Sequence, residues 1–118
     1  MKNESTNLDK VVVLWTSGDK EVALNMVLMY ALNAKKREWW KEVTLIIWGP
    51  SSNLVSKDLE LQEYVAQMKE VGVKIEACKT CADIYGVSNK LEELGIEVKL
   101  MGIPLTNYIK EGYKVMTF

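Results

Sequence analysis

The alternation of apolar and polar segments along the chain predicts five strands. Residues 11–15 and 43–48 are continuous apolar runs, which are typical of strands buried on both faces of a sheet. Residues 73–78 alternate between apolar and polar side chains, and residues 96–100 and 113–118 supply two further strand patterns. Helical or turn-forming segments separate these patterns, so we expect five distinct strands.

Helical patterns occupy the intervals between the strands. The break Thr16-Ser17-Gly18-Asp19 supplies N-cap residues for a helix that extends to about Lys36. A second helix, preceded by a loop over residues 51–57, is amphipathic and ends at Gly72, where a C′ glycine is expected. Three short helices, each followed by a glycine, are predicted over residues 79–85, 88–94 and 104–110.

The regular alternation of strands and helices predicts an α/β fold. We expect a three-layer α/β/α sandwich with a mainly parallel five-stranded sheet, because no hairpin signal such as Asn-Gly occurs. Residues 1–118 are predicted to form one domain, with a flexible N-terminal segment over residues 1–9. Ligands of such sheets bind at the carboxyl ends of the strands. The loops at residues 16–19 and 49–53 and the segment that begins at Cys78 therefore form the candidate site.

The first predicted helix is apolar around nearly its whole circumference. Among residues 22–34, only Asn25 and Asn33 are strongly polar. A helix of this kind must be covered on more than one side, and a small monomer has little with which to cover it. We therefore expect self-association, with this helix at a subunit interface.

Composition excludes several classes of protein. The chain has 118 residues, of which 48% are hydrophobic and 26% charged, so it can form a sizeable core without disulfide bonds. The net charge is −1 and basic residues form no stripe, which argues against nucleic-acid binding. The polar N-terminus lacks a signal-peptide core, and no apolar stretch is long enough to span a membrane. We expect a cytoplasmic protein whose two cysteines are reduced thiols.

The chain contains no histidine, which narrows the available chemistry. Ser-His-Asp and Cys-His catalysis and histidine metal sites are excluded within one chain. Two cysteines supply only half of a tetrahedral zinc site, and neither a G-x-G-x-x-G nor a G-x-x-x-x-G-K motif is present. We therefore expect neither a resident metal nor a cofactor; a zinc ion shared between subunits is the alternative.

Cys78 and Cys81 form a C-x-x-C motif at the junction between a predicted strand and a predicted helix. If Lys79 opens the helix, Cys78 lies at its N-cap, where unpaired N–H groups, the helix dipole and the Lys79 charge favour a thiolate. An activated cysteine that attacks and carries sulfur needs such an environment. The alternative is that both thiols are small core residues, and the residues alone support the two interpretations equally. On the first interpretation, Cys78 is the more reactive thiol and Cys81 a helper or bystander.

Candidate binding residues lie at the same edge of the predicted sheet. Ser17 and Gly18 form a turn that could hold an anion at a helix N-terminus, although capping is the ordinary role of such a turn. Gly49 lies in the second loop, and Lys79 and Thr80 follow the first cysteine. These five residues are the candidate binding set.

With these features, the chain resembles the DsrE/DsrF-like sulfur-relay proteins, also called the YchN-like fold. The resemblance rests on the strand and turn at residues 11–18, on the segment IEACKTCADIYGV at residues 75–87, and on the closing strand at residues 113–118. In sulfur-carrying members of that family, a cysteine follows the third strand and a glycine comes after it at a fixed interval. Cys78 and Gly86, eight positions apart, match these two residues.

The resemblance implies a five-stranded parallel α/β/α sandwich that assembles into trimers or hexamers. It also implies that Cys78 stores sulfane sulfur as a persulfide and passes it between partner proteins, as a sulfurtransferase or sulfur carrier. Sulfur donor and acceptor proteins are the expected partners, and nucleic acid and membranes are not. Cys81 is not part of the minimal pattern, so a dithiol oxidoreductase that uses both cysteines stays open, as does a non-catalytic oligomer that binds a small ligand.

Overall fold

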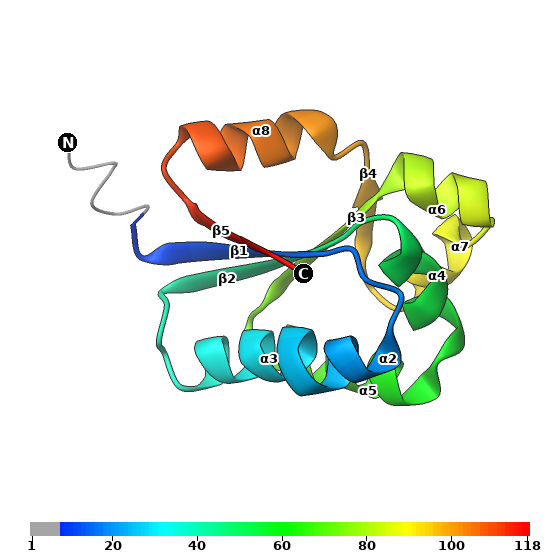
Figure 1. The fold of residues 1–118 in the computed structure, drawn as a ribbon, viewed down its shortest axis with the longest axis horizontal. Coiled ribbons are helices and arrows are strands. Elements are labelled where there is room, and N and C mark those ends of the chain that lie inside the picture. The colour runs from blue at the N-terminus through cyan, green and yellow to red at the C-terminus, as the bar shows by residue number, and fades with distance from the viewer. Residues whose placement is uncertain (1–7) are drawn as a thin grey trace.

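The computed structural model describes residues 8–118 of the chain (Figure 1). Within this range, five strands form one sheet in the order β4-β3-β2-β1-β5, and neighbouring strands are parallel. The predicted five-stranded parallel sheet is therefore confirmed. The strands are β1 (Lys10–Trp15), β2 (Glu42–Ile47), β3 (Lys74–Cys78), β4 (Glu97–Lys99) and β5 (Lys114–Thr117).

Helices cover both faces of this sheet, which confirms the α/β/α arrangement. Below the sheet in Figure 1 lie α3 (Leu28–Lys36) and α5 (Leu59–Val71), and above it lies α8 (Gly102–Lys110). The other helices gather beside the carboxyl ends of the strands, at the right of Figure 1. They are α2 (Lys20–Val22), α4 (Pro50–Lys57), α6 (Lys79–Tyr85) and α7 (Ser88–Glu93).

The helix predicted between residue 20 and Lys36 is present, with an irregular turn inside it. Asp19 caps its start, and the Asp19 carboxylate accepts a hydrogen bond from the Val22 N–H at 3.1 Å. A π-helical turn, η1 (Ala23–Val27), joins α2 to α3. One side of this helix is buried against the sheet, whereas Met26 and Met29 remain 36% and 48% exposed. Part of its apolar surface is therefore uncovered.

Residues 51–57, predicted as a loop, form helix α4 instead. Gly49, with a φ of 77°, and Pro50 in the first turn start this helix. Ser51, one of the serines that suggested a loop, is fully buried. Its hydroxyl donates to the Trp15 carbonyl at 2.6 Å and accepts from the Trp48 N–H at 3.2 Å. The polar side chain thus ties α4 to the ends of β1 and β2 rather than facing water.

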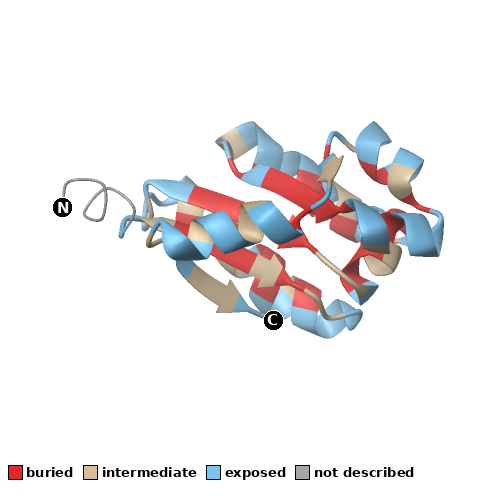
Figure 2. Cartoon of the chain, turned by 90° about the horizontal axis from the view of Figure 1, so that it is seen from above, coloured by how far each residue is buried: buried red, intermediate tan, exposed pale blue. Residues whose placement is uncertain are grey.

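The two faces of the sheet differ in polarity. The face towards α3 and α5 is apolar and includes Val13, Leu45 and Ala77. The face towards α8 carries Cys78 in a smaller apolar cluster, together with the buried carboxylate of Glu76. Figure 2 shows buried residues along the strands and exposed ones on the outer sides of the helices. Helix α8 has no fully buried residue, so the face that carries Cys78 is thinly covered.

The strands from β1 to β4 lie side by side in chain order, and the chain then returns across the sheet to place β5 on the other side of β1. Helix α8 makes this return over the face opposite α3 and α5, and β5 then pairs with β1 (Figure 1). Connections that keep a right-handed crossover change faces when the direction of strand addition reverses. The Phe118 carbonyl accepts hydrogen bonds from the Thr16 N–H at 2.7 Å and the Ser17 N–H at 3.2 Å, which fastens the chain after β5 to the loop after β1.

The expected flexible segment at residues 1–9 falls mostly outside the described residues, which begin at residue 8. The Asp9 carbonyl accepts a hydrogen bond from the Lys41 N–H at 2.9 Å, so this residue is held against the start of β2. Within residues 8–118, no helix is both long and apolar enough to cross a membrane.

Candidate functional site

Strand β3 and helix α6 bring both cysteines to the carboxyl edge of the sheet. Cys78 is the last residue of β3 and the N-cap of α6, with a φ of −71° and a ψ of 116°. Its side chain makes no capping hydrogen bond, so the thiol is not used to satisfy the helix terminus. Cys78 is 5% exposed, Cys81 is half-buried, and both are free thiols. The sulfur that the sequence singles out is unpaired but shielded from solvent.

The Cys81 thiol interacts with both Cys78 and Gly49. Burial raises the pKa of the Cys81 thiol, and its hydrogen bonding and charge interaction with Cys78 raise the pKa further. A hydrogen bond from the backbone N–H of Gly49 acts in the opposite direction but is outweighed. Cys81 therefore holds its proton more firmly than an ordinary cysteine.

Gly49 has a backbone conformation that other residues rarely adopt. Its φ of 77° and ψ of −140° turn the chain from β2 into α4 while its N–H is directed at Cys81. The predicted loop at residues 49–53 and the cysteine segment therefore meet at the carboxyl edge, as sheet topology requires.

Gly49→Ala should destabilise the protein by about 1–3 kcal/mol, because a Cβ makes this conformation strained. No atom lies within 4 Å of the position that the Cβ would take, so the loss would come from the backbone and not from a clash. Urea unfolding of the reduced protein measures it. Gly102→Ala is the matched control, since Gly102 also has open space around it but has no positive φ. Equal losses in both variants would contradict the conformational explanation.

The charge of Lys79, expected beside Cys78, is directed elsewhere. The exposed Lys79 ammonium forms an ion pair with Asp83 at 2.9 Å, one turn further along α6. A cation on the thiol face is supplied by Lys99 instead, because Cys78 and Lys99 are register partners in β3 and β4. The Lys99 ammonium extends to the Glu76 carboxylate, 2.6 Å away.

Glu76 is a fully buried carboxylate two residues before Cys78, on the same face of β3. Its Oε1 accepts a hydrogen bond from the Tyr108 hydroxyl at 2.8 Å, and its Oε2 lies 2.6 Å from Lys99 and 3.4 Å from Lys74. Burial alone would raise the pKa of Glu76, but these three partners together hold the pKa below its ordinary value. The carboxylate is therefore ionised, and Tyr108 ties α8 to the sheet through it.

Glu76, Lys99 and Tyr108 are not among the site residues predicted from the sequence. One signal was available, since the period-two alternation of a strand puts Glu76 on the face of Cys78, and a buried Cys78 implies a buried Glu76. A buried carboxylate then needs a cation or a donor. Lys74 lies two residues before it on the same strand, but its other two partners come from β4 and α8, and no sequence spacing reveals which residues of those elements reach it.

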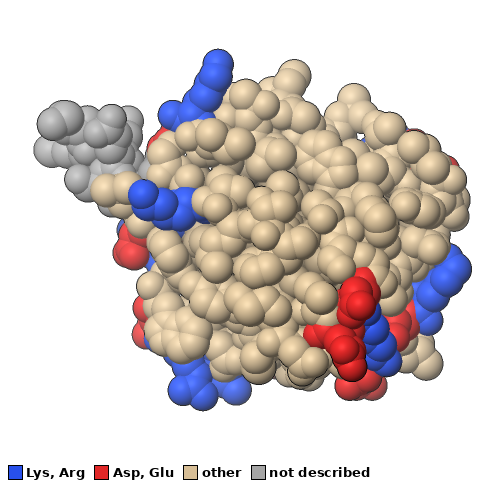
Figure 3. Space-filling model, viewed as in Figure 1, with Lys and Arg blue, Asp and Glu red and all other residues tan. Residues whose placement is uncertain are grey.

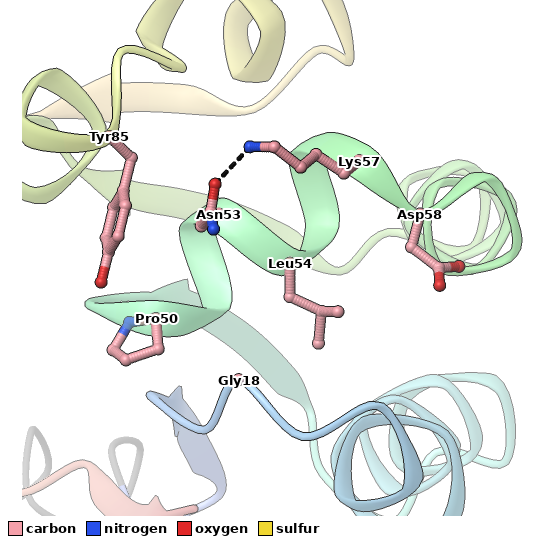
Figure 4. A pocket seen from close by; sticks show the side chains of 7 residues that line it. All are labelled: Gly18, Pro50, Asn53, Leu54, Lys57, Asp58 and Tyr85. Carbon is pink, nitrogen blue, oxygen red and sulfur yellow. Dashed lines mark hydrogen bonds between the residues drawn. The ribbon is translucent and has the colours of Figure 1, made fainter.

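A pocket of about 390 Å³ opens at the same edge of the sheet (Figure 4). Of the predicted binding residues, Gly18 lines it, and Tyr85 enters from α6, one turn beyond Cys81. Neither cysteine lines the pocket, so it is separate from the thiols. Its lining residues are Gly18, Pro50, Asn53, Leu54, Lys57, Asp58 and Tyr85.

Two further predicted binding residues have other contacts or face solvent. The Ser17 hydroxyl accepts a hydrogen bond from the Asp19 N–H at 3.1 Å, which stabilises the turn before α2. Thr80 is exposed in the first turn of α6. Of the whole candidate set, the structure brings together the two cysteines and Gly49.

Comparison with known proteins gives one family and several solved structures. The model of a family described as DsrE/DsrF-like matches residues 9–118. BT1422 from Bacteroides thetaiotaomicron, a conserved protein of unknown function, has 44% sequence identity and a TM-score of 0.90 over 93% of this chain and 95% of its own. No curated protein matches the chain.

Two more distant structures share the fold. They are the ychN protein from E. coli, with a TM-score of 0.74, and MTH1491 from Methanobacterium thermoautotrophicum, a protein of unknown function, with a TM-score of 0.78. Each is 19% identical to the chain, and each alignment covers 92% of this chain and 98% of the other.

Proposed function

The chain belongs to the DsrE/DsrF-like family, and from this premise we propose that it carries sulfane sulfur as a persulfide on Cys78. The family is associated with sulfur relay. The observation that carries the proposal is the position of Cys78, which ends β3 and caps α6 while its thiol makes no capping bond. The Cys78 sulfur is therefore not committed to the helix terminus and can act as a nucleophile once a donor persulfide reaches it.

The transfer is a nucleophilic exchange between sulfur atoms. The Cys78 thiolate attacks the outer sulfur of a donor persulfide, a new S–S bond forms, and the inner sulfur of the donor leaves as a thiolate. An acceptor thiolate then attacks the outer sulfur on Cys78 in the same way. Both steps are redox-neutral, so thiolates alone are sufficient for them.

The surroundings of Cys78 support this role. The unpaired N–H groups in the first turn of a helix stabilise negative charge at the N-cap. Cys81, whose pKa is raised, stays protonated beside it and supplies a hydrogen-bond donor for a sulfur anion on Cys78. Ile46 and Met101 pack in the same cluster as Cys78 and limit the access of water to the persulfide.

Incubation with inorganic polysulfide, followed by measurement of the intact mass, tests the proposal. We expect the unsubstituted chain to gain one sulfur atom at early times, Cys78→Ser to gain none, and Cys81→Ser to gain and keep it. Cys81→Ser is the matched control because it removes the neighbouring thiol of the same motif. The absence of an adduct from every form would reject the carrier function.

We also propose that the chain self-associates with further copies of itself. Met26, Met29 and Trp39 are 36%, 48% and 54% exposed and line a hollow of about 410 Å³ on the α3 side of the molecule. Figure 3 shows one face of the molecule, on which the charged side chains lie towards the left and the lower right and a broad area between them carries none. Arg37 lines the same hollow, so the apolar surface that two copies would share has one cation beside it. A trimer or hexamer is the assembly that the family resemblance implies.

Sedimentation velocity at micromolar concentration should give a mass that is a multiple of 13.4 kDa. Met29→Lys, which places a second cation in the hollow that Arg37 also lines, should move the population towards the monomer. Ile84→Lys is the control, since Ile84 is 76% exposed and does not line the hollow. A single species of 13.4 kDa for the unsubstituted chain would contradict self-association.

The pocket beside Gly18 favours a second candidate function, in which an oligomer binds a small molecule and its thiols are incidental. Its volume of about 390 Å³ suits a small ligand, and it lies at the carboxyl ends of parallel strands. The polysulfide experiment separates the two functions, because this one requires no sulfur uptake by any form of the chain.

A further inference from the structure

The chain has a second thiol that a simple sulfur carrier does not need. Cys78 and Cys81 are the only cysteines in the sequence, and both pack in the apolar cluster on the α8 side of the sheet. The Cys81 thiol interacts directly with the Cys78 thiol. A persulfide on Cys78 would therefore have one intramolecular thiol beside it.

We propose that Cys81 resolves a Cys78 persulfide, releasing hydrosulfide and leaving a disulfide between Cys78 and Cys81; the inference rests on the proposed function. The Cys81 sulfur attacks the inner sulfur of the persulfide, and a Cys78–Cys81 bond forms. The bond to the outer sulfur breaks, and that sulfur leaves as hydrosulfide with the proton that Cys81 gives up. The two cysteine sulfurs lose two electrons and the sulfane sulfur gains them, so the step balances without another oxidant.

The placement of the two cysteines suits a disulfide. Positions three residues apart lie on one side of a helical turn, with side chains roughly 5–6 Å apart at Cβ before any adjustment. A disulfide needs Cα atoms about 4.4–6.8 Å apart, and the Cys78 thiol is not held in a capping hydrogen bond that a disulfide would have to break. The Gly49 N–H, directed at Cys81, stabilises the negative charge that develops on the attacking sulfur as its proton leaves.

Burial favours this internal route over attack by a thiol from solution. Cys78 is 5% exposed and lies in the cluster that α8 covers, so an outside thiol must first displace part of that cover. Cys81 already packs in the same cluster as Cys78. The disulfide that results must be reduced before another cycle, so the chain would act between a sulfane-sulfur donor and a dithiol reductant. Its product would be hydrosulfide rather than a persulfide passed intact.

The test uses the full-length, fully reduced chain, loaded briefly with inorganic polysulfide and freed of excess reagent by rapid gel filtration. Sulfide is then trapped with a bimane reagent while the intact mass is followed without reductant. We expect the unsubstituted chain to release one hydrosulfide and to end lighter by two hydrogens than the reduced chain before loading, because the disulfide has formed. Cys81→Ser should keep its added sulfur and release sulfide at least about tenfold more slowly, because only outside thiols can resolve it. Cys81→Ala should behave like Cys81→Ser, which excludes a role for the serine hydroxyl.

The outcomes distinguish this inference from the carrier function. If the unsubstituted chain keeps the persulfide as long as Cys81→Ser does, or if both release sulfide at the same rate, the resolving role of Cys81 is wrong and the carrier function stands. If neither the unsubstituted chain nor Cys81→Ser takes up sulfur on Cys78, the carrier function fails and this inference fails with it.

Discussion

Lys99→Met should lower the free energy of unfolding by about 2–4 kcal/mol at neutral pH. The Lys99 ammonium lies 2.6 Å from the fully buried Glu76 carboxylate, although Lys99 itself is one-third exposed. Methionine keeps the apolar stem but leaves the Glu76 charge with the Tyr108 hydroxyl and with Lys74, which is 3.4 Å away. A buried charge that loses its main partner is strongly destabilising, and these remaining contacts reduce the loss.

Urea unfolding at pH 7 measures this loss. Lys74→Met is the control, because Lys74 is 56% exposed and lies further from the same carboxylate. Its removal should lower the free energy of unfolding by clearly less than the removal of Lys99. Equal losses in the two variants would show that the Glu76–Lys99 ion pair is not the dominant contact.

The pH dependence of the difference in unfolding free energy between Lys99→Met and the unsubstituted chain shows whether the unpaired Glu76 charge causes the loss. The pKa of Glu76 in the folded chain lies below its ordinary value of 4.5, so its stabilisation is present above that pH and is lost as the pH falls through the folded pKa. The difference between Lys99→Met and the unsubstituted chain should therefore be largest near pH 7 and shrink below about pH 4. A difference that does not vary with pH would point to lost packing of the lysine stem.

Tyr108→Phe should increase the rate at which a small alkylating reagent labels Cys78 by at least about tenfold. Burial and the neighbouring Glu76 raise the pKa of Tyr108, so its hydroxyl keeps its proton and donates to Glu76 at 2.8 Å. A hydrogen bond to a charged group contributes about 1.5–3 kcal/mol, and α8 has no fully buried residue that would hold it otherwise. Without this bond, states in which α8 moves off the sheet and Cys78 becomes accessible are more populated.

Peptide mass spectrometry separates labelling at Cys78 from labelling at Cys81. Tyr64→Phe removes the same hydroxyl from a tyrosine that packs on the opposite face of the sheet, and it should leave the labelling rate of Cys78 unchanged. If Tyr108→Phe and Tyr64→Phe label at the same rate, access to Cys78 does not depend on the contact between α8 and Glu76.

The fold could be predicted largely from apolar periodicity, and the exception has a physical cause. The apolar runs at residues 11–15 and 43–48 correspond to β1 and β2. Both strands are buried on both faces, so each appears in the sequence as a continuous apolar run that indicates a strand. The helix α4 was missed because Ser51 is buried and its hydroxyl bonds to the Trp15 carbonyl and the Trp48 N–H. A polar residue whose hydrogen bond is made inside the protein cannot be told from a solvated one by composition alone.

The candidate site was predictable in its position but not in its electrostatics. Cys78 could be placed at the start of a helix because an alternating strand ends there. Lys79 is its neighbour in sequence, yet a helix brings residues four apart together, and the ammonium pairs with Asp83. Lys99 reaches the thiol face through the register between β3 and β4, and strand register depends on contacts that sequence distance does not encode.

During synthesis, the ribosome completes β1 long before β5, its partner in the sheet. Until residues 102–118 emerge, β1 is an open edge and no helix lies over the face that carries Cys78 and Cys81, whereas α3 and α5 can already cover the other face. A nascent chain at that stage exposes both thiols to oxidants and offers an unpaired strand to its neighbours. Shielding of the reactive sulfur is thus acquired last, in the same event that closes the edge of the sheet.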